Sequence, residues 1–62
     1  VARRSLVAAR AIAAGETLGE ADVQAKRPEG GISPMRVGQV LGRRVRRALA
    51  EDEMLAWGDL EA

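Results

Sequence analysis

The residues best suited to bind a ligand lie in one short stretch, KRPEGGISP, at positions 26–34. Pro28 disfavours the helical region for the residue before it, so Arg27 is expected to be extended. Pro28 also restricts its own φ, and Gly30 and Gly31 permit a sharp return of the chain. A guanidinium presents five donors in a rigid plane, which suits an amide carbonyl on a ligand. The pattern predicts an outward-pointing Arg27; the alternative is a solvated arginine on a turn, as most surface arginines are.

The rest of the sequence offers no recognisable catalytic or metal-binding constellation. The chain contains no Cys and no His, and zinc and other transition metals are held mainly by those two side chains. Its acidic residues therefore have no Cys or His partner, and no pair of carboxylates can be assigned to acid–base work. The EGG triplet lacks the glycine spacing and the Lys-Ser/Thr pair of a phosphate-binding loop. We expect no catalytic residue, no cofactor and no metal ligand in this chain.

A second basic stretch, RRVRR at positions 43–47, could bind nucleic acid, because phosphate contacts favour clustered arginines. However, Trp57 is the only aromatic residue available for base stacking. Ten basic and nine acidic residues leave a net charge of +1, so long-range attraction to nucleic acid or an anionic membrane is weak. We expect neither as a partner. The arginines are interpreted as a charged strand edge or a contact to another domain, and Trp57 as packing in the core or at a domain interface.

At 62 residues the chain suffices for one small domain, residues 1–62, of marginal stability. Natural scaffolds of this size add disulfides, a metal or a partner surface, and without Cys or His the partner surface remains. No apolar run approaches the ~20 residues that span a bilayer, and no signal-peptide pattern opens the chain. The first residue is Val1, which fits a piece of a longer chain or an incompletely recorded N-terminus. The absence of Cys is compatible with a reducing compartment, and we expect a cytoplasmic location.

An internal repeat appears when the chain is shifted by 37 residues. RAIAAGETLGEADV at positions 10–23 then aligns with RALAEDEMLAWGDL at positions 47–60. The identical pairs are Arg10/Arg47, Ala11/Ala48, Ala13/Ala50, Glu16/Glu53, Leu18/Leu55 and Asp22/Asp59. In each copy a turn, containing Gly15 or Asp52, precedes a leucine expected to be buried. Arrays of repeats need three or more units, so two copies predict a pseudo-twofold fold; the alternative is chance similarity in an Ala- and Arg-rich chain.

The segment between the copies, SPMRVGQVLG at positions 33–42, is typical of a short helix of about two turns. Ser33 is a good N-cap, Pro34 suits the first helical position, and Gly42 suits the position after the end. The apolar residues of the segment recur at i, i+3 and i+4, which places them on one face.

Two further segments, positions 3–14 and 43–50, carry conflicting signals. Good helix formers favour helix, whereas period-2 alternation favours strand, and neither the residues nor the repeat decides. GEADV and WGDL, near the end of each copy, are interpreted as single helical or 3₁₀ turns that press Val23 and Leu60 inward.

The order of these motifs resembles the antifreeze-like (SAF) domain at the C-terminus of sialic acid synthases. The similar segments are IAAGETLGEADV, KRPEGGISPM, VLGRRV and EDEMLAWGDLE, and the resemblance extends from about Leu6 to Glu61. KRP…GISP is the most specific of them, whereas the AGE.L…D pattern recurs in other members of the wider superfamily. The resemblance implies a mostly β fold with short helical turns, the β-clip, with internal pseudo-twofold symmetry. It favours strand for the two ambiguous segments.

The resemblance also implies a function. Sialic acid synthases condense phosphoenolpyruvate with an N-acetylated hexosamine, such as N-acetylmannosamine, to form a nine-carbon sialic acid. A TIM barrel with a divalent metal, Mn or Mg, carries out the chemistry, and the non-catalytic small domain caps the barrel of the partner subunit in a domain-swapped homodimer. An arginine of the KRP segment meets the N-acetyl group of the sugar, and by its position in the motif that residue is Arg27. Pro28, Gly30 and Gly31 then shape the loop, and Lys26 faces the opposite way, solvated or paired with an acid.

Two other functions stay open from the sequence. A stand-alone SAF module that binds carbohydrate or protein would have no barrel, and the KRP…GISP segment counts against it. An ice-binding protein is the other alternative, because type III antifreeze proteins share the fold. Ice binding needs a flat, weakly polar surface, whereas this chain has one Thr, no Asn and 31% charged residues.

Overall fold

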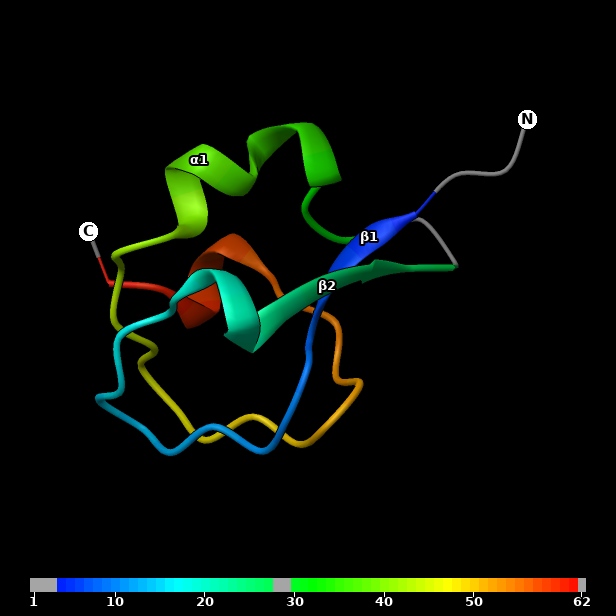
Figure 1. Ribbon diagram of the computed structural model, residues 1–62. Coiled ribbons are helices and arrows are strands. Elements are labelled where there is room, and N and C mark those ends of the chain that lie inside the picture. The colour runs from blue at the N-terminus through cyan, green and yellow to red at the C-terminus, as the bar shows by residue number, and fades with distance from the viewer. Residues whose placement is uncertain (1–3, 28–29, 62) are drawn as a thin grey trace.

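The computed structural model describes residues 4–27 and 30–61 of the chain. Its regular elements are short and are joined by extended segments and turns (Figure 1). In chain order they are the strand β1 (Ser5–Ala8), the 3₁₀ turn η1 (Glu20–Asp22), the strand β2 (Val23–Lys26), the 3₁₀ turn η2 (Pro34–Arg36), the helix α1 (Val37–Val40) and the 3₁₀ turn η3 (Trp57–Asp59). This is the small, mostly extended domain with short helical turns that the sequence predicts.

The strands β1 and β2 form an antiparallel ribbon in which Ser5 pairs with Lys26 and Ala8 pairs with Val23. All four residues of β1 are buried, whereas β2 alternates between half-buried and exposed positions. Because successive strand residues point to opposite faces, Val23 and Ala25 share the half-buried face and Lys26 lies on the other. The ribbon therefore places Lys26 at its end, with Arg27 directly after it.

The two copies of the repeat face each other across Ile12 and Leu49. Each of these residues donates its N–H to the carbonyl of the other, at 2.8 Å in both directions. The flanking bonds come in pairs related by the 37-residue shift: the N–H of Gly15 to Val45 O with the N–H of Asp52 to Ala8 O, and the N–H of Leu18 to Arg43 O with the N–H of Leu55 to Leu6 O. Figure 1 shows the two segments running past one another at the base of the molecule. The repeat therefore reflects equivalent backbone pairing and not chance similarity.

The core draws apolar side chains from both copies and from the segments around them. The buried apolar side chains are Leu6, Val7, Ala8, Ile12, Leu18, Ile32, Val40, Val45, Leu49, Leu55 and Leu60. Leu18 and Leu55, the leucines predicted to follow each turn, are 1% and 0% exposed, so both predictions are confirmed. Backbone pairing between the copies also explains why positions 3–14 and 43–50 contain no helix where the structure describes them. Long-range pairing outweighs their helix propensity.

The helix predicted for positions 33–42 is present as η2 followed directly by α1. The Ser33 side chain accepts a hydrogen bond from the Met35 N–H (3.2 Å), and Gly42 has a φ of +88° just beyond the helix. Val40 is buried, so packing stabilises an element too short to be stable by itself. Within the described residues, no helix has the length and apolar character needed to cross a membrane.

The predicted one-turn segments are the 3₁₀ turns η1 and η3. Leu60 is buried and Val23 packs against the core, as expected. Trp57, however, is 45% exposed, which excludes the core as its environment; the other environment expected for it, a domain interface, stays a prediction. None of the three residues of η3 is buried, and Leu60, directly after the turn, is the residue that packs in the core. The Trp57 ring instead lies against the Arg43 guanidinium, 5.7 Å from the ring centroid, in a cation–π contact.

Candidate functional site

Arg27 follows directly after β2 and is exposed, as the sequence predicts; its contact with a substrate stays a prediction. Its neighbour Lys26 leaves the ribbon on the opposite face, where its Nζ lies 2.6 Å from Asp52 Oδ1. An acidic partner on that face is one of the two environments expected for Lys26. Pro28, the third residue of the KRP segment, lies outside the described residues.

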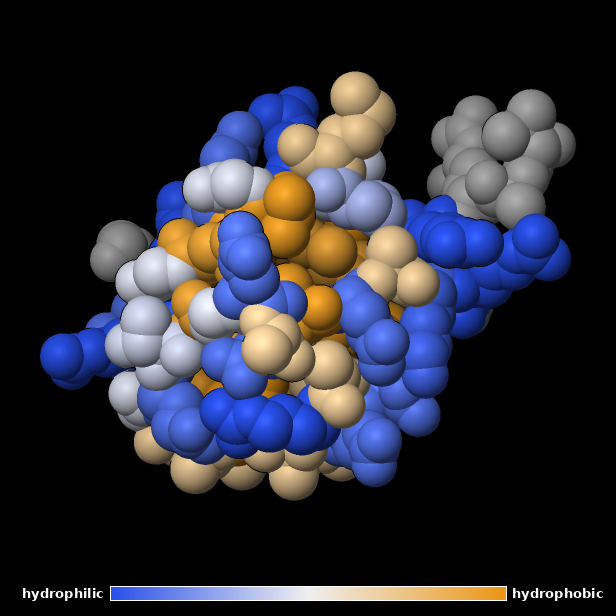
Figure 2. Space-filling model, viewed as in Figure 1, coloured by the Kyte–Doolittle hydropathy of each residue, from blue (hydrophilic) through white to orange (hydrophobic). Residues whose placement is uncertain are grey.

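The surface beside Arg27 is hollowed. Arg4, Ala25, Lys26 and Arg27 line an open depression of about 420 Å³, which we term the basic hollow. Figure 2 shows strongly hydrophilic residues gathered at this end of the ribbon, beside the apolar residues near the centre of the same view. The candidate site is therefore a positively charged depression with Arg27 on its wall.

Gly30 and Gly31 return the chain from the ribbon towards the core. Gly30 has a φ of +136°, a backbone region that favours glycine. The Gly31 N–H donates to the buried Ser5 Oγ (3.1 Å), which ties the loop to β1. A Cβ on Gly31 would lie 2.5 Å from Met54 Cγ and 2.7 Å from Leu55 O, so any side chain there forces a shift. Gly30 thus permits the turn, and Gly31 permits a close approach to Met54 and Leu55 in the second copy of the repeat.

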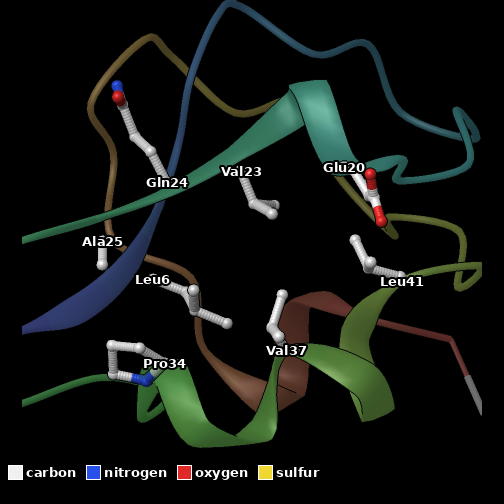
Figure 3. A pocket seen from close by; sticks show the side chains of 8 residues that line it. All are labelled: Leu6, Glu20, Val23, Gln24, Ala25, Pro34, Val37 and Leu41. Carbon is white, nitrogen blue, oxygen red and sulfur yellow. The ribbon is translucent and has the colours of Figure 1, made fainter.

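A second depression, the apolar groove, lies between the ribbon and α1 and has a volume of about 350 Å³ (Figure 3). Its apolar wall is made of Leu6, Val23, Ala25, Pro34, Val37 and Leu41. Ala25 lines both the apolar groove and the basic hollow, so the two depressions adjoin. Sequence analysis missed this groove. The signal that could have found it is the alternation of Val23, Ala25 and Arg27, which share one face of an extended segment.

Arg10 is the centre of an ion-pair cluster within the first copy of the repeat. Its Nε donates to Asp22 Oδ1 (2.9 Å) and its Nη2 donates to Glu16 Oε1 (3.1 Å). The bond from Arg10, together with the Ala13 N–H at 2.6 Å, lowers the pKa of Glu16 below its ordinary value. The pKa of Asp22 is also lowered, chiefly by the Gly19 N–H at 2.8 Å.

Arg47 builds the matching cluster in the second copy. Its Nε donates to Asp59 Oδ1 (2.9 Å) and its Nη2 donates to Glu53 Oε2 (2.5 Å). The pKa of Glu53 is lowered first by this guanidinium and then by the Ala50 N–H at 2.9 Å. Both clusters join residues from the start, the turn and the end of one copy, so their role is structural. Across the described part of the chain, no three acidic side chains form a group that could hold a metal ion.

The arginines of the RRVRR stretch are largely used inside the domain. The Nε of Arg43 donates to Gln39 O (2.7 Å), and the Nε of Arg46 donates to Leu60 O (2.9 Å). Arg47 belongs to the cluster described above. These contacts favour the structural interpretation of the stretch over a phosphate-binding patch.

The SAF domain family model matches residues 3–61. The chain belongs to the SAF domain family. The solution structure of an antifreeze protein like domain in the human N-acetylneuraminic acid phosphate synthase gene has the same fold, with a TM-score of 0.89. The match covers 94% of this chain and 75% of that chain at 24% sequence identity. The family recognised from the sequence motifs is confirmed.

Two longer proteins contain a segment similar to this SAF domain. An uncharacterized protein of Methanocaldococcus jannaschii is 39% identical over 59 residues, which cover 95% of this chain and 18% of that protein. The N,N'-diacetyllegionaminic acid synthase of Campylobacter jejuni is 40% identical over 55 residues, which cover 89% of this chain and 16% of that enzyme. The chain thus spans less than a fifth of the length of either relative.

Proposed function

We propose that this SAF domain closes over the active site of a sialic acid synthase that joins phosphoenolpyruvate to an N-acetylated hexosamine. The observation that carries the proposal is the exposed Arg27 at the end of the ribbon, on the wall of the basic hollow. The similarity to the legionaminic acid synthase of Campylobacter jejuni and to the antifreeze-like domain of the human synthase gene supports it.

In this function Arg27 donates hydrogen bonds to the amide carbonyl of the sugar's N-acetyl group. Closure of the domain over the barrel mouth excludes water, which strengthens that contact. Pro28, Gly30 and Gly31 hold the loop in the conformation that presents the guanidinium. The domain supplies binding and orientation, while the bond-forming residues belong to the barrel.

The same proposal defines the parent protein. It is a cytoplasmic homodimer in which each SAF domain, wound as a β-clip, caps the TIM barrel of the partner subunit. The barrel holds a divalent metal, Mn or Mg, and this domain contributes none of its ligands. The exposed Trp57 and the Arg43 guanidinium against it belong to the interface with the barrel.

The test is an Arg27→Ala substitution in the full-length protein that contains this domain. We expect kcat/KM for the N-acetylated hexosamine to fall by the equivalent of about 1.5–3 kcal/mol, the size of a charge-assisted hydrogen bond. The KM for phosphoenolpyruvate should change much less, because Arg27 meets only the sugar. An Arg27→Lys variant should recover little, since an ammonium lacks the planar fork of donors.

The matched control is Arg44→Ala, which removes an exposed arginine that does not line the basic hollow. We expect it to leave the kinetics with both substrates nearly unchanged. Equal losses for the sugar and for phosphoenolpyruvate in Arg27→Ala would mean that Arg27 shapes the domain and does not bind the sugar. A full-length protein without synthase activity would refute the proposed function as a whole.

A further inference from the structure

Two arginines adjoin the open end of the β1–β2 ribbon, Arg4 directly before β1 and Arg27 directly after β2. The antiparallel register ends with the pair Ser5 and Lys26, and continuing it by one residue would set Arg4 opposite Arg27. Opposite residues in an antiparallel pair lie about 5 Å apart, and their side chains leave on the same face. Like charges close together repel each other, so two cations at this end of the ribbon carry a local energetic cost.

Both guanidiniums border one open space. Arg4 and Arg27 are exposed, and both line the basic hollow. Lys26 also lines the hollow, but its ammonium is drawn to Asp52 on the opposite face. Within the described part of the chain, and with Lys26 paired to Asp52, the remaining positive charge that lines the hollow is that of the two arginines.

The surroundings of Arg4 and Arg27 differ from those of Arg10. Arg10 is held by two carboxylates at 3.1 Å or less. Among residues 4–27 and 30–61, no acidic side chain forms an ion pair with Arg4 or Arg27. An anion bound between two neighbouring cations stabilises them, because its attraction to each cation offsets the repulsion between the two.

We propose that Arg4 and Arg27 together bind one oxyanion, a phosphate or carboxylate group, in the basic hollow. Each guanidinium can donate two parallel N–H bonds to such a group, which makes a pair of arginines a selective clamp for it. The adjoining apolar groove, reached past Ala25, leaves room for the less polar part of the molecule that carries the anion. The identity of the molecule that carries the oxyanion rests on the proposed function. If that function holds, the oxyanion is a substituent of the amino sugar.

The site is tested on the 62-residue chain with inorganic phosphate as the probe. Titration is followed by NMR at the arginine Nε–Hε signals, with chloride at equal ionic strength as the blank. We expect saturable shifts at Arg4 and Arg27 and none at Arg44, an exposed arginine that does not line the hollow. Arg4→Gln and Arg27→Gln should each weaken phosphate binding by about fivefold to tenfold, and Arg44→Gln should leave it unchanged.

A charge reversal provides a second, independent readout. Arg4→Glu should abolish phosphate binding and raise the thermal midpoint of unfolding, because the new carboxylate pairs with Arg27. Shifts no larger than those in chloride, or equal affinity in wild type and Arg4→Gln, would overturn the proposal. A lower midpoint for Arg4→Glu would also overturn it, because the two side chains would then not face each other.

The source of the oxyanion is separated by comparing ligands. An N-acetylated hexosamine phosphate that binds more tightly than inorganic phosphate and than the unphosphorylated sugar supports an anionic sugar substrate. Tighter binding of acetate than of phosphate supports a carboxylate. These outcomes are independent of the proposed function, since a full-length protein without synthase activity would leave the anion site intact. Conversely, a chain that binds no anion could still contact a neutral sugar through Arg27.

Discussion

The two copies of the repeat, residues 10–23 and 47–60, share backbone pairing and an ion-pair cluster, but the chain continues differently after each copy. In the first copy Val23 begins β2, which leads to Lys26 and Arg27. Its counterpart in the second copy, Leu60, forms a single bridge with Val45. The candidate site therefore lies in the part of the chain that is not repeated, on a scaffold that the repeat builds.

The turns of the two copies also differ in chemistry while their backbone agrees. Gly15 has a φ of +89° and Asp52, at the equivalent place, has a φ of +67°. Glycine enters this region without strain, and aspartate is one of the few other residues that tolerate it. Asp52 in addition provides the carboxylate that pairs with Lys26, with Nζ 2.6 Å from Oδ1. The turn of the second copy thus carries a residue that tolerates a positive φ less well than glycine but forms an ion pair with the end of β2.

The largest effect is expected at Gly31, which lies outside both copies and touches the second. Gly31→Ala should destabilise the domain by about 1–3 kcal/mol, because its Cβ would overlap Met54 and the Leu55 carbonyl. The matched control is Gly58→Ala, which places in the second copy the residue that the first copy has as Ala21. No atom lies within 4 Å of a Cβ at Gly58, so a change within about 0.5 kcal/mol is expected. Urea denaturation monitored by Trp57 fluorescence measures both, and equal losses would show that Gly31 is not specially constrained.

A smaller effect on the free energy of unfolding is expected at the two equivalent turn residues, Gly15 and Asp52. Gly15→Ala should cost about 1 kcal/mol of unfolding free energy, because the positive φ strains a side chain although no atom lies within 4 Å of its Cβ. Asp52→Gly relieves the same strain while losing the Lys26 ion pair, so a net change within about 0.5 kcal/mol is expected. The urea midpoints of the two variants test this. A neutral Gly15→Ala would mean that the turn relaxes in solution.

The smallest effect is a pH dependence shared by both copies. The pKa values of Glu16 and Glu53 are lowered by Arg10 and Arg47 respectively. A lowered folded-state pKa contributes stability that is present above the ordinary glutamate value and is lost as the pH falls through the folded-state value. Carboxyl ¹³C titration should therefore find both glutamates below their ordinary range. Arg10→Ala should raise the pKa of Glu16 towards that range, although the Ala13 N–H still lowers it, and should leave the pKa of Glu53 unchanged. A rise at Glu53 as well would show that the clusters are coupled.

The sequence by itself determined the features that depend on short-range chemistry. The caps at Ser33 and Gly42, the turns at Gly15 and Asp52 and the inward Leu60 result from local conformational preferences and spacing, and each appears where the pattern predicts it. The exposure of Arg27 was also predictable from the sequence, because a charged side chain is rarely buried unless it is paired.

Only the tertiary structure decided the features that depend on contacts between distant residues. Ile12 is extended because its N–H and carbonyl are bonded to Leu49, a pairing that helix propensity does not report. Trp57 is exposed, and its ring lies against the guanidinium of Arg43, a residue distant in the sequence. Arg4 and Arg27 line the same hollow because β1 pairs with β2, and residues so far apart in the chain have no relation until the strands pair.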